Sequence, residues 1–474
     1  MCHRLRTRTG PVALAGVAAA LLLGGGAVPV ALAQVPSPTP GAPMAANASQ
    51  TRATAPRAAV PSAQSPALSA QERRIAAWVD GHVDEAIGFL ERSVNVNSGS
   101  LNLAGVRAMA DLYAPELAAL GFETRWIPMP DSMRRAGHLL AERGGTRGRC
   151  VLLVGHLDTV FEPDGPFQRF ERQGSRAVGP GVNDMKGGNT VILWALKALQ
   201  SVGALDGAHV IVAFTGDEES VGRPHEVSRR DLVDAARRCQ VSLEFETAVR
   251  DSIVEYATIA RRSATGWRLA VTGRTAHTSG VFSPGVGAGS VFEASRILHR
   301  FYEELREQYV TFSSGLIVGG TEAEITADRG TAEGKSNVVP RTVLATGDLR
   351  TLSPEQEQRV RDRMRAIVAE NLPRTSATIA FTDGYPPMAP TEGNRRLFEM
   401  LDRVTVDMGL PPMQVLPPDQ RGASDAAFVA PYTDVLSGMG VYGESAHAPG
   451  ESMDLATFGR QITRTAILVY RLTR

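Results

Sequence analysis

The sequence has little cysteine. Its 474 residues include three cysteines, and one of them, Cys2, lies in a predicted leader. We interpret the other two, Cys150 and Cys239, as buried thiols rather than nucleophiles, and the sequence does not decide whether they pair. Two cysteines in a chain of this size exclude a disulfide-dense scaffold, so a conventional apolar core is expected.

The sequence also lacks an excess of either charge. It has 50 basic and 50 acidic residues, a formal net charge of +0. Arg4, Arg6 and Arg8 are the only charged residues of the leader, so its removal leaves 47 basic against 50 acidic residues, a net charge of −3. A charge of this size gives no reason to expect nucleic acid or an anionic membrane as a partner.

Residues 1–33 have the pattern of a secretory signal. Three arginines precede an apolar run from Val12 to Leu23, and Ala31-Leu32-Ala33 forms an A-x-A cleavage site. The apolar run is too short and too rich in glycine and alanine for a permanent membrane anchor. We therefore expect an exported protein, periplasmic or secreted. Residues 34–69, rich in proline, alanine, serine and threonine without a period, predict a disordered linker.

The remaining length predicts two domains. Residues 70–261 and 386–474 alternate amphipathic helices, such as 70–92, with buried strands, such as 151–154. This α/β pattern predicts a mixed, largely parallel sheet flanked by helices. Residues 262–385 instead contain a strand, a helix, several strands, a second helix and a closing strand, which predicts an inserted α+β domain.

Histidine and carboxylate side chains follow several of the predicted strands. Each one alone fits an ordinary polar turn, a helix N-cap or a satisfied histidine as well as it fits a ligand. Together they indicate a metal site, because open α/β sheets bind ligands at the carboxyl ends of their strands. The candidates are His156, Asp184, Glu219, Glu246 and His447, with Asp158 and Glu218 beside them.

The chemistry of these side chains favours zinc, because mixed imidazole and carboxylate ligands suit zinc better than magnesium. Five ligands are too many for one catalytic zinc, whereas two ions that share a bridging carboxylate would use them all. Asp158, two residues after His156, is placed to accept the other ring N–H of that histidine. Glu218 can take a proton from an attacking water and deliver it to a leaving amine. The set predicts hydrolysis of an amide.

The order of these motifs resembles the dizinc aminoacylase/carboxypeptidase family, which includes glutamate carboxypeptidase, aminoacylase and succinyl-diaminopimelate desuccinylase. The resemblance extends from about residue 70 to the end of the chain. It rests on His156-x-Asp158, on Gly-Val-Asn-Asp184-Met-Lys-Gly-Gly, on Asp-Glu218-Glu219, on Phe-Glu246 and on the late His447.

The resemblance implies a zinc-peptidase catalytic domain that binds two zinc ions per subunit. His156, Asp184 and Glu246 would bind one ion. Asp184, Glu219 and His447 would bind the other, with Asp184 as the bridge. Asp158 and Glu218 match the orienting aspartate and the catalytic glutamate of the family.

The resemblance further implies that residues 262–385 are a dimerisation or lid domain, and hence a homodimer. His277 would reach the substrate of the other subunit, and Asn337 and Arg350 would bind the substrate carboxylate. Tyr385 stands where glutamate carboxypeptidases have an arginine used for substrate. This departure weakens a strict preference for a C-terminal glutamate.

The expected function is that of an exported dizinc carboxypeptidase, which releases a C-terminal amino acid with a free carboxylate from a small peptide or N-acyl substrate. The first alternative is a deacylase or desuccinylase of N-acyl amino acids, which has the same metal chemistry. The second is a non-catalytic, metal-dependent binding protein on the same fold, for which a general base at Glu218 would have no use.

Overall fold

The computed structural model describes residues 68–252 and 254–474. The predicted leader, residues 1–33, and the predicted linker up to residue 67 lie outside the described residues. In the part of the chain that is described, no helix is both long and apolar enough to span a bilayer.

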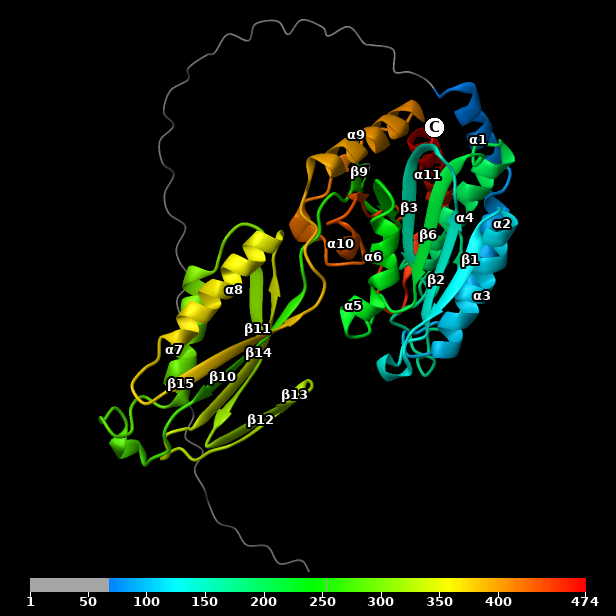
Figure 1. Ribbon diagram of the computed structural model, residues 1–474. Helices are drawn as coiled ribbons and strands as arrows, with labels where there is room; N and C mark the ends of the chain where they lie inside the picture. Colours follow the sequence, from blue (N-terminus) through cyan, green and yellow to red (C-terminus); the bar gives the residue numbers. More distant parts are fainter. Residues whose placement is uncertain (1–67, 253) are drawn as a thin grey trace, which may run out of the picture. The chain divides into compact units, whose positions relative to one another are not determined.

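A six-stranded mixed sheet forms the centre of the larger part (Figure 1). β3 pairs in parallel with β6 and with β7, and β17 extends the sheet in parallel beyond β7. β2 pairs antiparallel with β6 and with β1. The predicted mixed α/β sheet is therefore confirmed. In spatial order the strands are β1 (Glu123–Pro128), β2 (Gly137–Arg143), β6 (Ala208–Thr215), β3 (Arg147–His156), β7 (Val241–Glu244) and β17 (Asp434–Leu436).

Both faces of this sheet are covered by helices, because successive side chains of a strand point to opposite faces. Val151 and Leu153 of β3 belong to one core, and Leu152 and Val154 belong to the other. The first core contains α1 (Ala70–Asp80), α2 (Val83–Val94), α3 (Leu103–Ala119), α4 (Lys186–Ser201), α9 (Glu392–Asp407) and α11 (Phe458–Leu472). The second contains α6 (Arg230–Ala236) and α10 (Ala426–Val429), with α5 (His225–Ser228) just before α6.

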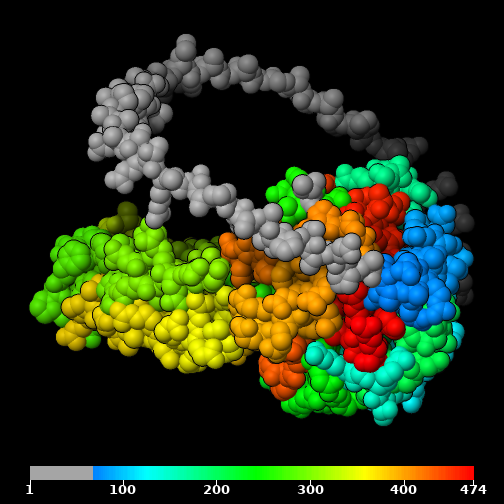
Figure 2. Space-filling model, turned by 90° about the horizontal axis from the view of Figure 1, so that it is seen from above, coloured from blue at the N-terminus to red at the C-terminus, as the bar shows by residue number. Residues whose placement is uncertain are grey.

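The predicted helix over residues 70–92 is two helices. The break falls at Gly81 and His82, between α1 and α2. Glycine is among the weakest helix formers, so a break there costs little, and each short helix can then turn its own apolar side to the core. α1 lies against the last helix of the chain, α11 (Figure 2). Arg471 of α11 donates a 2.7 Å hydrogen bond to Glu72 of α1, which joins the two ends of the described chain.

Residues 265–383 form a second sheet with a core of its own. Its four strands are antiparallel, in the order β11-β14-β10-β15, and two helices pack on it. This is the strand and helix order predicted for the inserted segment. The elements are β10 (Thr265–Thr272), α7 (Ser290–Glu304), β11 (Thr311–Gly320), β14 (Thr342–Arg350), α8 (Pro354–Ala369) and β15 (Ser376–Asp383), with a hairpin of β12 (Glu322–Thr326) and β13 (Arg329–Glu333).

Two small sheets and four short 3-10 helices complete the described elements. The first sheet has the order β16-β9-β8, and the second the order β18-β19-β5-β4. Their strands are β4 (Glu171–Gln173), β5 (Arg176–Val178), β8 (Val249–Asp251), β9 (Val254–Ala257), β16 (Gln414–Val415), β18 (Gly443–Glu444) and β19 (Ser452–Asp454). The 3-10 helices are η1 (Asp131–Met133), η2 (Thr278–Gly280), η3 (Pro418–Gln420) and η4 (Leu455–Thr457).

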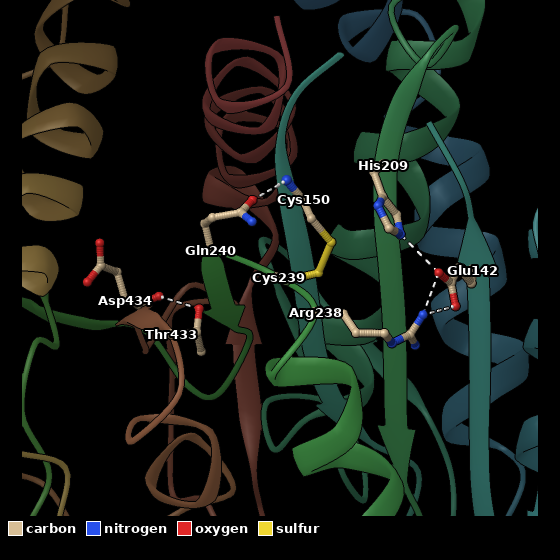
Figure 3. The surroundings of a disulfide bond; sticks show 8 residues. All are labelled: Glu142, Cys150, His209, Arg238, Cys239, Gln240, Thr433 and Asp434. Carbon is tan, nitrogen blue, oxygen red and sulfur yellow. Dashed lines mark hydrogen bonds and ion pairs between the residues drawn. A yellow bond between two sulfur atoms is a disulfide. The ribbon is translucent and has the colours of Figure 1, made fainter. Parts of the chain in front are cut away.

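Cys150 and Cys239 form a disulfide, with Cα atoms 4.6 Å apart, which answers the question of pairing that the sequence left open (Figure 3). The bond joins β3 to the turn between α6 and β7. Gln240 accepts a 2.9 Å hydrogen bond from the main-chain N–H of Cys150, and Arg238 donates to Glu142 of β2 at 2.7 Å. The sequence could not decide the pairing because the two cysteines are 89 positions apart.

A buried arginine fixes the turn that follows β6. Arg229 is 2% exposed and lies between two carboxylates, with an ion pair to Asp217 and a 2.7 Å hydrogen bond to Asp425. Asp425 accepts from Thr215, the last residue of β6, at 2.7 Å, and Asp217 accepts from the N–H of Gly222 at 2.8 Å. The turn that carries Glu218 and Glu219 is thereby held at its start and at its end.

Reduction of the disulfide should lower the free energy of unfolding by about 2–4 kcal/mol, because the unfolded chain regains the entropy of a long loop. Urea unfolding followed by circular dichroism, with and without reductant, measures this. A variant with both Cys150→Ser and Cys239→Ser should no longer respond to reductant. An unchanged midpoint after verified reduction of the wild type would contradict the prediction.

Arg229→Met should lower the free energy of unfolding by about 3–5 kcal/mol, because it leaves two buried carboxylates without a counter-charge. The matched control is Arg230→Met. Arg230 is exposed and pairs with Asp231 at 2.9 Å, and exposed pairs contribute about 0–1 kcal/mol. Equal losses for the two variants in denaturant unfolding would contradict the role of the buried arginine.

Candidate metal centre

The five side chains predicted as metal ligands lie together. His156 Nε2 is 3.2 Å from Asp184 Oδ1 and 3.3 Å from Glu246 Oε1. His447 Nε2 is 3.0 Å from Asp184 Oδ2 and 3.1 Å from Glu219 Oε2. The contacts therefore divide the side chains into two groups of three, and Asp184 offers one oxygen to each group.

The central sheet places three of these side chains. His156 is the last residue of β3, Glu219 lies in the turn after β6, and Glu246 follows β7 by two residues. The carboxyl ends of these three neighbouring parallel strands meet at one edge of the sheet. Asp184 joins them from the glycine-rich turn before α4, and His447 joins from the loop after β18.

Neighbouring glutamates face different parts of this centre. Ligand atoms of Glu218 lie within 4.8 Å of those of His156 and Glu246, and ligand atoms of Glu219 lie within 4.8 Å of those of His156 and Asp184. The contact of Glu219 with His447 assigns it to the second group of three. Glu218 thus lies close to two members of the first group, whereas Glu219 belongs to the second.

Crowding of carboxylates shifts the pKa values in the centre. Burial, together with the nearby Glu246, raises the pKa of Glu218 well above its usual range. Burial and the nearby Asp184 raise the pKa of Glu219 to about 7. Hydrogen bonds to Asp184 and Glu219 raise the pKa of His447 to about 11. When its carboxylates are all ionised, the centre holds more negative charge than its two imidazoles can offset, and divalent cations would supply the missing positive charge.

The donor set fits zinc. Each group of three contains one imidazole nitrogen and carboxylate oxygens that converge from different elements. Catalytic zinc takes three protein ligands and leaves a fourth position for water or substrate. Imidazole and carboxylate donors converging in this way are those expected around zinc.

Asp158 has a wider role than the sequence predicted. The closest acceptor for Nδ1 of His156 is the main-chain carbonyl of Asp158 at 3.0 Å, while the carboxylate lies at 3.5 Å. That carboxylate accepts from the main-chain N–H groups of Glu218 and Glu219, both at 3.0 Å, and from the hydroxyl of Ser100 at 2.6 Å. The residue orients the histidine and also holds the turn that carries both glutamates.

Glu451 is a site residue that the sequence reasoning missed. It is fully buried, and its carboxylate accepts hydrogen bonds from the main-chain N–H groups of Gly181, Asn183 and Asp184 at 3.1, 2.7 and 2.8 Å. It lies four positions after His447, so it ties the loop of that histidine to the turn of Asp184. No spacing rule identifies such a contact, because the partners are 267–270 positions apart.

Arg261 is a second residue of the site that the sequence reasoning did not identify. Its buried guanidinium lies 3.3 Å from Glu244 and 3.5 Å from Glu246, and its Nε donates to the hydroxyl of Ser437 at 2.9 Å. The side chain comes from the connection that leads into the inserted segment, and it places a fixed positive charge behind one of the candidate ligands.

The three residues predicted to bind substrate lie in the inserted segment. His277 forms a β-bridge with Val338, and the main-chain carbonyl of Asn337 accepts from the N–H of Thr278 at 3.0 Å, so the two predicted residues are neighbours, both exposed. Arg350 ends β14, where it pairs with Asp348 at 2.6 Å. Among the described residues, no hydrogen bond or ion pair joins these three to the candidate metal ligands.

Comparison with known proteins identifies the family. The family model described as peptidase family M20/M25/M40 matches residues 152–471. Carboxypeptidase G2 from Pseudomonas sp. (strain RS-16) is 25% identical over 396 residues, which cover 81% of this chain and 89% of that protein. Succinyl-diaminopimelate desuccinylase from Methylobacterium radiotolerans is 26% identical over 335 residues, 68% of this chain and 80% of that protein.

Solved structures share the fold. The crystal structure of aminopeptidase PepT from Bacillus cereus superposes with a TM-score of 0.65, at 16% identity, over 83% of this chain and 99% of that one. The predicted family, fold class and enzyme class are confirmed. Because the family model spans more than half of the sequence, the chain belongs to peptidase family M20/M25/M40 and is a zinc-dependent metallohydrolase.

Proposed function

We propose that this protein is an exported carboxypeptidase that uses two zinc ions to cleave the amide bond of a C-terminal amino acid with a free carboxylate. The observation that carries the proposal is the pair of ligand groups that share Asp184, with Glu218 beside them. The similarity to carboxypeptidase G2 over most of both chains supports this substrate class.

The first zinc would be held by His156, Asp184 and Glu246, and the second by Asp184, Glu219 and His447. When bound, two zinc ions supply Lewis acidity to the scissile carbonyl and to the attacking water.

Glu218 is the general base of the proposed reaction. It takes a proton from the attacking water and delivers it to the nitrogen of the leaving amino acid, so that the C–N bond breaks as an amine is released. Burial and the neighbouring Glu246 raise the pKa of Glu218 above its usual range. The main-chain contacts of Asp158 hold the turn from which it acts.

The inserted segment would bind the substrate carboxylate. Arg350 offers a guanidinium fork, which suits a carboxylate, and Asn337 offers an amide. His277 and Asn337 are exposed, and within residues 68–252 and 254–474 no hydrogen bond or ion pair joins them to a candidate ligand of the same subunit. We therefore include a homodimer in the proposal, in which His277 completes the site of the other subunit.

An apolar surface on the inserted segment supports the dimer. Of the large apolar side chains that the structure exposes, several lie on or near α7 and β11. Two of them, Phe282 and Phe292, pack on each other with ring centroids 5.5 Å apart, and exposed apolar side chains that gather in this way are typical of a protein–protein contact. These side chains are Phe282, Val291, Phe292, Tyr302 and Ile317.

The disulfide supports the exported location. Structural disulfides form and persist in oxidising compartments such as the periplasm, and they are rare in the cytosol. The bond between Cys150 and Cys239 therefore fits the predicted signal at residues 1–33 and a periplasmic or secreted enzyme.

A second candidate function is deacylation or desuccinylation of N-acyl amino acids. The similarity to succinyl-diaminopimelate desuccinylase, 26% identity over 68% of this chain, favours it. The metal chemistry is the same, and only the groups that hold the acyl part differ. A release assay on matched dipeptides and N-acyl amino acids, each with a series of C-terminal residues, separates the two.

Glu218→Gln should retain both zinc ions but lower kcat by about 10²–10⁴-fold, the usual contribution of a general base. Metal analysis and the release assay measure the two effects. The matched variant Glu219→Gln should instead lose zinc, because it removes a ligand. Loss of zinc from Glu218→Gln would contradict the assignment, and a wild type with two zinc ions but no activity on either substrate series would favour a binding protein.

His277→Ala should abolish turnover without loss of zinc, because the residue acts on the site of the partner subunit. Mixing His277→Ala with Glu218→Gln should restore activity, since a mixed dimer contains one subunit with an intact base beside a partner with an intact His277. Light scattering that shows a fully active monomer would contradict the dimer.

A further inference from the structure

Tyr385 contacts the turn after β6, which carries Glu218 and Glu219, although it lies more than 160 positions further along the chain. It lies in the second connection between the inserted segment and the central sheet, after β15 and before α9. Its hydroxyl donates a hydrogen bond to the main-chain carbonyl of Glu218. The tyrosine that stands here in place of the arginine of glutamate carboxypeptidases therefore contacts the residue proposed as the general base.

The structure holds Tyr385 firmly in this place. Its ring packs against the ring of Phe428, with centroids 5.2 Å apart. The ring of Phe428 is in turn contacted by the guanidinium of Arg229, 5.5 Å from its centroid. The main-chain carbonyl of Tyr385 accepts a 2.9 Å hydrogen bond from the N–H of Ala264 in the first connection. Gly384 packs so closely on Ala264 that a side chain there would lie 2.2 Å from its carbonyl oxygen.

The main chain of Glu218 is held on both sides of its Cα atom. Its N–H donates to Asp158 at 3.0 Å, and its carbonyl accepts from Tyr385. Among the described residues these are the hydrogen bonds that Glu218 makes, and none of them involves its carboxylate. The point from which the side chain of Glu218 leaves the main chain is therefore fixed by the hydrogen bonds of the peptide groups on either side of it.

The two connections between the central sheet and the inserted segment are paired with each other by main-chain hydrogen bonds. Arg261 and Met388 exchange two main-chain hydrogen bonds of 2.9 Å, and the Ala264–Tyr385 bond extends this pairing. Arg261, on the first connection, reaches Glu246 at 3.5 Å. Each connection thus sends one side chain to the candidate metal centre. Arg261 contacts the candidate ligand Glu246, and Tyr385 contacts the proposed base Glu218.

We propose that Tyr385 is a positioning residue for catalysis, and that its hydroxyl keeps the carboxylate of Glu218 aligned with the attacking water by fixing the carbonyl of the same residue. The proposal rests on the role of Glu218 in the proposed function. Catalytic groups need placement to within a fraction of an ångström, and a misplacement of about 1 Å can cost about 10²-fold in rate.

Tyr385→Phe tests the proposal, because it removes the hydroxyl and retains the ring on Phe428. With the N-acyl amino acid or dipeptide that the wild type cleaves fastest, kcat should fall by about 10- to 100-fold, while KM stays within about twofold. Zinc content and the thermal unfolding midpoint should equal those of the wild type. This combination distinguishes a loss of alignment from a loss of folding or of metal.

The matched control is Tyr432→Phe. Tyr432 lies near Arg237, which approaches its hydroxyl at 3.5 Å, and in the described part of the chain no hydrogen bond joins it to Glu218. The kcat of Tyr432→Phe should equal that of the wild type. A kcat of Tyr385→Phe within twofold of the wild type would overturn the proposal, and so would a loss that parallels a loss of zinc. A wild type that cleaves neither substrate class would instead contradict the proposed function.

Discussion

Four carboxylates share one edge of the central sheet, and the rest of the structure accommodates this crowding. Asp184, Glu218, Glu219 and Glu246 repel one another in a largely buried place, and burial alone makes ionised carboxylates costly. Two imidazoles and the guanidinium of Arg261 offset part of this charge, and metal ions would offset the remainder. A site of this kind is stable only when its counter-charges are held in place.

Much of the surrounding polar structure provides that support. Glu451 binds the N–H groups of the turn that carries Asp184, and Asp158 does the same for the turn that carries Glu218. Behind the second turn, Arg229 neutralises a further pair of buried carboxylates. Fully partnered buried networks of this type restrict a loop to one conformation. Apart from His156, which ends β3, the candidate ligands thus come from loops, and buried hydrogen bonds hold the turns of Asp184 and Glu219 in place.

The convergence of the candidate ligands could be predicted from the sequence because two local patterns coincide in it. A short, wholly apolar segment such as residues 151–154 predicts a strand with both faces buried, and His156 follows at its carboxyl end. The supporting residues carry no such pattern. Glu451 and Tyr385 act through main-chain groups more than 160 positions away, and nothing in the neighbouring residues marks those partners. The disulfide was undecided for the same reason, and the helix break at Gly81 was missed because the apolar period continues across it.

The distribution of the ligands along the chain also determines when the centre can exist. Asp184 and His447 are 263 positions apart, and the inserted segment lies between them. His447 enters the centre only after the chain has left the sheet, completed the inserted segment and returned. A nascent or unfolded chain therefore has no assembled metal centre. Metal ions would thus bind the complete centre only after the residues on both sides of the inserted segment have folded together.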